Sequence, residues 1–171
     1  MSLHSYSRCW IHLIWGTLNR EKILHQEARV RVSKFLADYS ASKDIYMKIN
    51  YVNADHVHVL IDLPTHLSIE EVAKLLKGSS SHWINKNRVI AQRFSWGRGY
   101  GAFSVSQSMV STLSKYIAGQ EEHHRQKSFV EEYEGFIKAY GLQIKQEENR
   151  QNGFAICFAF VRPAQAGCQW K

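Results

Sequence analysis

The sequence predicts an α+β fold of the ferredoxin-like type, an antiparallel sheet with helices on one face. Three observations support this prediction. Hydrophobic residues make up 44% of the 171 residues, which is enough for the core of a single domain. Strand-like alternation and helix-like spacing follow one another in the order strand, helix, strand, strand, helix, strand. The second and third strands are joined by a short connection, which favours a hairpin.

Hydrophobic patterning defines the first half of this core. Residues 5–17 alternate as a strand, and apolar residues at helical spacing predict a helix over residues 21–42. A second strand is predicted over residues 45–53. One face of the first strand carries Cys9, Ile11, Leu13 and Trp15. The opposite face of that strand carries Arg8, Trp10, His12 and Ile14. One face of the second strand carries Ile45, Met47, Ile49 and Tyr51.

The second half of the core contains a helix and a last strand. Ser68 followed by Glu71 is a capping-box pattern that opens a helix to about residue 87. Gly78 and the three serines after it weaken this helix; they either let a ligand backbone come close or mark a bend. Residues 94–106 are rich in glycine and aromatic residues, and their second half alternates as a strand. The sheet face away from the two helices is expected to stay open.

Further helices are predicted beyond the core. Ser106 or Ser108 can cap a helix that continues to about residue 125, and Ser128 with Glu131 forms a second capping box. Gly141 suits the end of that last helix. The pattern changes after residue 146. We therefore expect one domain over residues 1–146, followed by a linker and an atypical tail over residues 147–171, which is either an added strand, a disordered extension or a fusion.

The charge favours a polyanionic partner, with nucleic acid as the first choice. The formal net charge is +7, and nine histidines add to it. The three cysteines do not have the spacing of a disulfide framework or a zinc site, which fits a reducing, cytoplasmic compartment. The N-terminus lacks the pattern of a signal peptide, and no apolar run reaches the length of about 20 residues that a membrane span requires.

A His-x-His pair is the first candidate functional motif. His56 and His58 lie on a predicted strand over residues 56–63, where alternation places both on the same face, about 7 Å apart along the strand. Val57, Val59 and Ile61 then form the core face. Two parallel imidazoles can bind one divalent cation, although such a pair alone is more often an ordinary polar pair.

A second motif lies on the helix predicted after residue 106. Tyr116 and Gln120 are four residues apart, one helical turn, and therefore share a face. The amide oxygen of Gln120 could complete a metal site that two histidines begin. A tyrosine phenol beside such a metal is a candidate nucleophile. Gly119, between them, indicates either close packing or mobility.

Basic and aromatic residues between the two motifs are candidate DNA contacts. The alternative for about half of the basic residues is that they are solvated surface charges without a DNA contact. The alternative for the aromatic residues is that they pack in the core. The candidates for phosphate contacts are Lys74, Lys77, Arg88, Arg93 and Arg98, and the candidates for stacking on unpaired bases are Trp96 and Tyr100.

The order and content of these motifs resemble the small single-tyrosine HUH transposases of IS200-type insertion sequences. The resemblance runs from about residue 4 to residue 142 and includes the segments at residues 10–15, 76–80 and 99–105. It implies the HUH endonuclease fold, with Tyr116 as the nucleophile. His56, His58 and Gln120 would be the ligands of Mg2+ or Mn2+. The tail does not take part in the resemblance.

The resemblance also implies a mechanism and partners. Such an enzyme cleaves and rejoins single-stranded DNA through a 5′-phosphotyrosine link and recognises hairpins near the ends of the element. It works as a homodimer, in which Tyr116 can complete the site of the partner subunit. Two alternatives remain: a non-catalytic or domesticated single-strand-binding protein of the same fold, and another HUH nuclease such as a replication initiator or relaxase.

Overall fold

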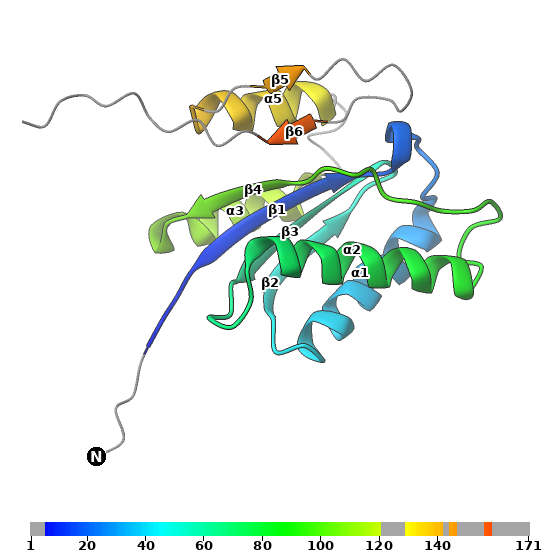
Figure 1. Ribbon diagram of the computed structural model, residues 1–171, viewed down its shortest axis with the longest axis horizontal. Helices are drawn as coiled ribbons and strands as arrows, with labels where there is room; N and C mark the ends of the chain where they lie inside the picture. Colours follow the sequence, from blue (N-terminus) through cyan, green and yellow to red (C-terminus); the bar gives the residue numbers. More distant parts are fainter. Residues whose placement is uncertain (1–5, 121–128, 142–143, 147–155, 159–171) are drawn as a thin grey trace, which may run out of the picture.

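The computed structural model describes residues 6–120, 129–141, 144–146 and 156–158. Its centre is a four-stranded antiparallel sheet in the order β2-β3-β1-β4, as the ferredoxin-like fold requires (Figure 1). The strands are β1 (Trp10–Gly16), β2 (Tyr46–Val52), β3 (His56–Asp62) and β4 (Gly101–Val105). The predicted α+β fold and element order are confirmed.

Two long helices cover one face of this sheet. They are α1 (Gln26–Ala41) and α2 (Ile69–Lys86), and a short 3-10 turn, Leu18–Arg20, precedes α1. The predicted capping box of α2 is present, since Ser68 and Glu71 bond to each other's backbone nitrogen. The apolar face of the sheet packs against both helices; it includes Ile11, Leu13, Trp15, Val57, Val59 and Ile61.

The opposite face of the sheet is covered too, so the expectation of an open face was wrong. A 3-10 turn, Gln107–Met109, leads into α3 (Val110–Ala118), which packs on Trp10 and Leu60 through Val110 and Ile117. The helix α5 (Phe129–Ala139) packs on β1 and β4 through Tyr133 and Ile137. Figure 1 shows both helices away from the side on which α1 and α2 lie. Apolar side chains on both sheet faces account for this second layer.

A β-bulge changes the faces of β2. Met47 pairs with Ile61 and Ile49 pairs with Leu60, so Lys48 is the extra residue. Met47 therefore packs toward α1 and α2, but Ile49 and Tyr51 pack on the other face beside α3. The predicted single face for Ile45, Met47, Ile49 and Tyr51 was wrong for this reason.

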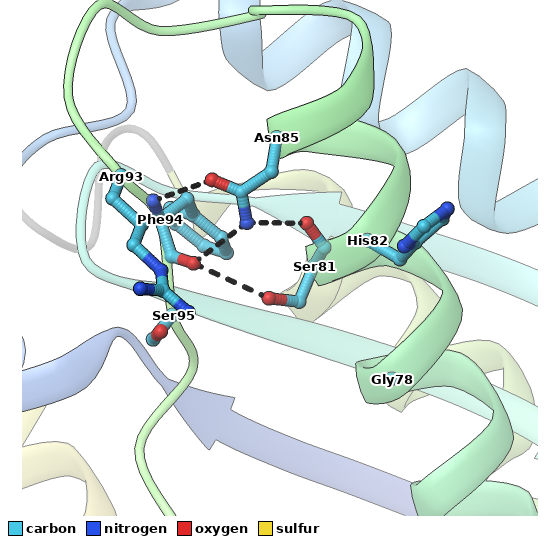
Figure 2. Close-up of a pocket in the computed structure, with 7 residues that line it drawn as sticks. All are labelled: Gly78, Ser81, His82, Asn85, Arg93, Phe94 and Ser95. Carbon is cyan, nitrogen blue, oxygen red and sulfur yellow. Dashed lines mark hydrogen bonds between the residues drawn. The ribbon is translucent and has the colours of Figure 1, made fainter.

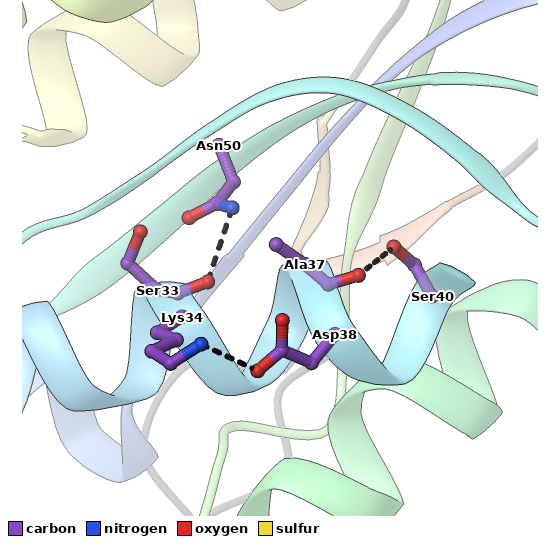
Figure 3. Close-up of polar contacts among 6 residues, drawn as sticks. All are labelled: Ser33, Lys34, Ala37, Asp38, Ser40 and Asn50. Atoms are coloured by element: carbon purple, nitrogen blue, oxygen red, sulfur yellow. Dashed lines mark hydrogen bonds and ion pairs between the residues drawn. The ribbon is translucent and has the colours of Figure 1, made fainter. Parts of the chain in front are cut away.

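The bulge also joins β2 to α1. After it, Asn50 faces α1, and its side-chain amide donates to the Ser33 carbonyl oxygen at 3.2 Å (Figure 3). The same helix carries the exposed ion pair between Lys34 and Asp38 and the bond from Ser40 Oγ to the Ala37 carbonyl. The contact at Asn50 fixes the strand against the helix at the point where its ladder is irregular.

The C-terminal part of the described chain adds a small hairpin. The strands β5 (Ile144–Gln146) and β6 (Ile156–Phe158) pair antiparallel as a separate two-stranded sheet. The predicted boundary at residue 146 stays a prediction, because most of residues 147–171 lie outside the described residues. The predicted cap at Ser128 also lies outside them. None of the helices that the structure describes is long and apolar enough to cross a bilayer.

Candidate active site

The two histidines of the His-x-His motif are buried at the centre of the sheet. Both lie on β3 and share a face with Leu60, as alternation predicts, and both are 0% exposed. Their ring centroids are 5.1 Å apart, with the rings nearly perpendicular. They do not look out from an open face, because α3 and α5 cover that side.

A polar partner engages the Nδ1 atom of each ring. Asp55 Oδ1 lies 2.6 Å from His56 Nδ1, and His12 Nε2 lies 3.1 Å from His58 Nδ1. The rings of His12 and His58 are also stacked, with centroids 5.3 Å apart. Nε2 is therefore the nitrogen through which each ring of the motif would bind a cation.

Sequence reasoning did not single out Asp55 or His12. Asp55 directly precedes His56, and this adjacency in the sequence could have identified its carboxylate as a partner of the imidazole. His12 was placed on the correct face of β1, and in this fold β1 pairs with β3. Pairing of the two strands would have brought His12 beside His58.

Burial favours the neutral form of two imidazoles of this site, those of His56 and His12. Loss of solvation lowers the pKa of His56, although the hydrogen bond and the charge of Asp55 act in the opposite direction. The same cause lowers the pKa of His12 to about 3. A neutral imidazole is the form that binds metal, so the electrostatics suit a ligand role for His56.

Tyr116 reaches this site from α3. The apolar positions Leu113 and Ile117 fix the helix on the sheet, and Tyr116 is half-buried beside them. Its ring centroid lies 6.4 Å from that of His58, with an interplanar angle of 85°. The structure thus brings the tyrosine and the histidine pair together within one chain.

Gln120 lies just beyond the end of that helix. The predicted helix to residue 125 is interrupted, because α3 ends at Ala118 with Gly119 as its C-cap. Gln120 is completely buried, as is its Oε1 atom. Residues 121–128, which include His123 and His124, are outside the described part of the chain. Within that part, no three His, Cys, Asp or Glu side chains are grouped to hold a metal ion.

The helix α5 contributes an aromatic cover to the site. Phe136 contacts the ring of His12 at 5.3 Å and the ring of Tyr116 at 5.9 Å between centroids. Close packing at Gly101 helps to place the helix, since a Cβ there would lie 2.9 Å from a Tyr133 ring carbon. Phe136 therefore limits the positions that Tyr116 can take.

The candidate DNA contacts have different surroundings. Lys74, Arg88, Arg93 and Arg98 are exposed. Trp96 is only 8% exposed; its ring packs edge-on against Trp15 and Phe94, and its nitrogen donates to Ser80. In this conformation Trp96 offers no ring face to a base.

Lys77 makes a clamp on the glycine-rich loop. Its Nζ donates to the carbonyl oxygens of Gly97, Arg98 and Gly99, at 2.8, 3.1 and 2.8 Å. It also lies 5.9 Å from the centroid of the Tyr100 ring. Burial lowers the pKa of Lys77 to about 8. The ammonium group thus donates to three carbonyl oxygens of the protein, and these bonds fix the conformation of the loop over residues 97–99.

A long segment between the two motifs has no negative side chain. Residues 72–120 contain no Asp or Glu. The basic residues of this segment are Lys74, Lys77, Lys86, Arg88, Arg93, Arg98 and Lys115. It spans α2, β4 and α3, so cationic groups occur on elements from both sides of the sheet. Such a distribution favours a large anionic ligand.

Comparison with known proteins agrees with this fold. The structure resembles that of a candidate transposase from Deinococcus radiodurans R1, with a TM-score of 0.56 and 23% identity over 70% of this chain and 96% of that one. It also resembles a REP-associated tyrosine transposase bound to a REP hairpin, with a TM-score of 0.50 and 12% identity over 72% and 74% of the two chains. The fold is that of the HUH-type tyrosine transposases.

Sequence comparison identifies the family. The family model described as "Transposase IS200 like" matches residues 5–120. Transposases for insertion sequence element IS200 from Salmonella typhimurium and Salmonella typhi are each 24% identical to this chain over 127 residues, which cover 71% of this chain and 83% of theirs. The chain therefore belongs to the IS200-like transposase family. The predicted resemblance is confirmed.

Proposed function

We propose that this transposase cleaves and rejoins single-stranded DNA with Tyr116 as its nucleophile. The observation that carries the proposal is the placement of the Tyr116 ring 6.4 Å from the ring of the buried His58. A phenol has an ordinary pKa of about 10 and needs assistance to lose its proton during attack. A cation held by the neighbouring imidazoles would provide that assistance.

The donor set suits a divalent cation. The imidazoles of His56 and His58 offer Nε2, and the buried amide of Gln120 offers Oε1. Two nitrogen donors and one oxygen leave room for phosphate oxygens and water, and Mg2+ or Mn2+ is the expected ion. When bound, the ion polarises the phosphate as a Lewis acid. Asp55 and His12 hold the two imidazoles in orientation.

The proposed reaction exchanges one phosphodiester for another. The Tyr116 oxygen attacks the phosphorus, the phenol proton leaves to solvent, and the bond from phosphorus to the 3′-oxygen breaks. The products are a 5′-phosphotyrosine link and a free 3′-hydroxyl, which takes up a proton. Attack by a 3′-hydroxyl reverses these steps and joins strands, so no external energy source is required.

The proposed partners are hairpin-bearing DNA and a second copy of the chain. A hairpin is bound in the REP-associated transposase that shares this fold. The exposed cations Lys74, Arg88, Arg93 and Arg98 are the proposed phosphate contacts. The homodimer is part of this proposal. Within one chain, the Tyr116 ring contacts the ring of His58. We place the enzyme in the cytoplasm because its substrate is DNA.

A covalent adduct tests the catalytic proposal. Labelled single-stranded DNA is incubated with the protein and Mn2+, and the denatured mixture is separated on a gel. Wild type should give a labelled protein band, and Tyr116→Phe should give none while it still binds DNA. Tyr39→Phe, on α1 across the sheet, is the matched control and should keep the adduct.

Two outcomes of this assay would change the proposal. An adduct that persists in Tyr116→Phe would mean that another residue is the nucleophile. Metal-dependent cleavage that persists in His56→Ala would reject the proposed cation site. A wild type that binds DNA but never forms the adduct would favour the alternative, a non-catalytic single-strand-binding protein of this fold.

A further inference from the structure

A second concave site lies on the other side of the sheet. A cavity of about 610 Å3 opens between α2 and the segment that follows it (Figure 2). It belongs to the layer formed by α1 and α2, whereas His56 and His58 face α3 and α5. The lining residues are Gly78, Ser81, His82, Asn85, Arg93, Phe94 and Ser95.

Hydrogen bonds fix one wall of this cavity. Asn85 accepts from the Phe94 backbone nitrogen at 2.8 Å and donates to the Phe94 carbonyl at 2.9 Å, as Figure 2 shows. Ser81 Oγ adds a weaker bond to the same carbonyl at 3.4 Å. The Phe94 ring is buried against Trp96, so the wall is anchored in the core.

The remaining polar side chains are available to a ligand. Arg93 and His82 are exposed, and neither makes a hydrogen bond or ion pair with another residue that the structure describes. None of the described residues that line the cavity is acidic, and all of them lie within the segment 72–120, which has no carboxylate side chain. These features select an anion.

No contact with the described residues requires glycine at position 78. Gly78 lies in the interior of α2, where glycine lowers helix stability relative to alanine. A Cβ added there would meet nothing within 4 Å, and the position does not need a positive φ. What the missing side chain provides is room on the cavity side, which a ligand that approaches the helix backbone would use.

We propose that this cavity holds a phosphodiester of the DNA substrate, remote from the phosphate that Tyr116 attacks. Arg93 pairs with the phosphate, and Gly78 lets the sugar–phosphate chain approach α2. The inference rests on the proposed function and deepens it, because it assigns a contact to DNA that passes the far side of the sheet. The contact contributes affinity and leaves the chemistry at Tyr116 unchanged.

Opposite effects on stability and binding test this site. Gly78→Leu should raise the melting temperature by a few degrees (~2 to 4 °C). It should also weaken binding of a long mixed-sequence single strand by about tenfold, because the leucine side chain occupies the cavity. Gly135→Leu is the matched control: Gly135 lies in α5, and its Cβ would also meet nothing within 4 Å. It should raise stability similarly and leave DNA affinity unchanged.

Salt dependence gives an independent measurement. Arg93→Gln should reduce the slope of log affinity against log salt by about 1, as loss of one phosphate contact requires. Unchanged affinity in Gly78→Leu together with an unchanged slope in Arg93→Gln would overturn the proposal. If Gly78→Leu is destabilised instead, the Arg93→Gln slope decides alone. Adduct formation by the wild type tests the proposed function separately, since it is scored without reference to affinity.

Discussion

His12 Nε2 lies 3.1 Å from His58 Nδ1, although the two residues are 46 positions apart in the chain. Adjacent antiparallel strands bring them together, and neither ring is accessible to solvent beyond 1%. If His58 binds a cation through Nε2, its Nδ1 carries the proton and donates to His12. A neutral His12 can accept that bond, and its lowered pKa keeps it neutral.

Removal of His12 should weaken metal binding. We expect His12→Leu to lower the affinity for Mn2+ by about 10- to 100-fold, because the Nδ1 proton of His58 loses its acceptor. Isothermal titration calorimetry measures this directly. The exposed His66 provides the control, and His66→Leu should bind Mn2+ like the wild type. Equal affinity of His12→Leu and wild type would show that His12 does not orient His58.

Stability should fall in mild acid without metal. The folded-state pKa of His12 is about 3, below its ordinary value of 6.5, so the unfolded chain binds more protons between these values. The free energy of unfolding should therefore decrease as pH falls from 6.5 toward 3, by up to about 1.4 kcal/mol per pH unit for such a group. Urea titrations at several pH values measure the slope, which His12→Asn should reduce and His66→Asn should not.

Loss of the Lys77 clamp should destabilise the protein. In Lys77→Met three loop carbonyls lose their common donor, and we expect a decrease of about 1–3 kcal/mol in the free energy of unfolding. Lys74→Met is the control, because Lys74 is exposed on the same helix. Its expected effect is within about 0.5 kcal/mol. Similar stabilities of the two variants would mean that the clamp contributes little.

Mixed variants distinguish a tyrosine that acts in its own subunit from one that acts across a dimer. Tyr116 and His58 are adjacent within one chain, so we expect a mixture of Tyr116→Phe and His56→Ala proteins to remain inactive. If the tyrosine crossed to the partner, one site of each mixed dimer would contain both native groups. Adduct formation in the mixture, and in neither protein alone, would therefore demonstrate exchange.

Local sequence signals were sufficient for the element order and for the proximity of three of the candidate site residues. Alternation placed His56 and His58 on one face, and helical spacing placed Tyr116 on a helix that lies over them. The covered second face was not predicted, because packing of α3 and α5 depends on contacts between distant segments. The contact of His12 with His58 was missed for the same reason, since it depends on pairing of β1 with β3.

The exposure of aromatic side chains also could not be predicted. Trp96 lies in a glycine-rich segment that suggested base stacking, yet its ring completes the core beside Trp15. Lys77 is similar, since its sequence context fits a phosphate contact and its ammonium group is used by the loop. Composition indicates which groups are present, whereas their accessibility is decided by tertiary packing.

The extra residue at Lys48 is what allows Met47 and Ile49, two positions apart, to face opposite sides of the sheet. Deleting Lys48 alone would leave Met47 opposite Ile61 and Ile49 opposite Leu60 in a regular ladder, so every later side chain of β2 would keep its present side. Deleting Lys48 together with Ile49 would put Asn50 opposite Leu60 and invert the rest of the strand. In an alignment of relatives, a gap of one residue at this point would therefore mark a strand without the bulge, and a gap of two an inversion of the strand beyond it.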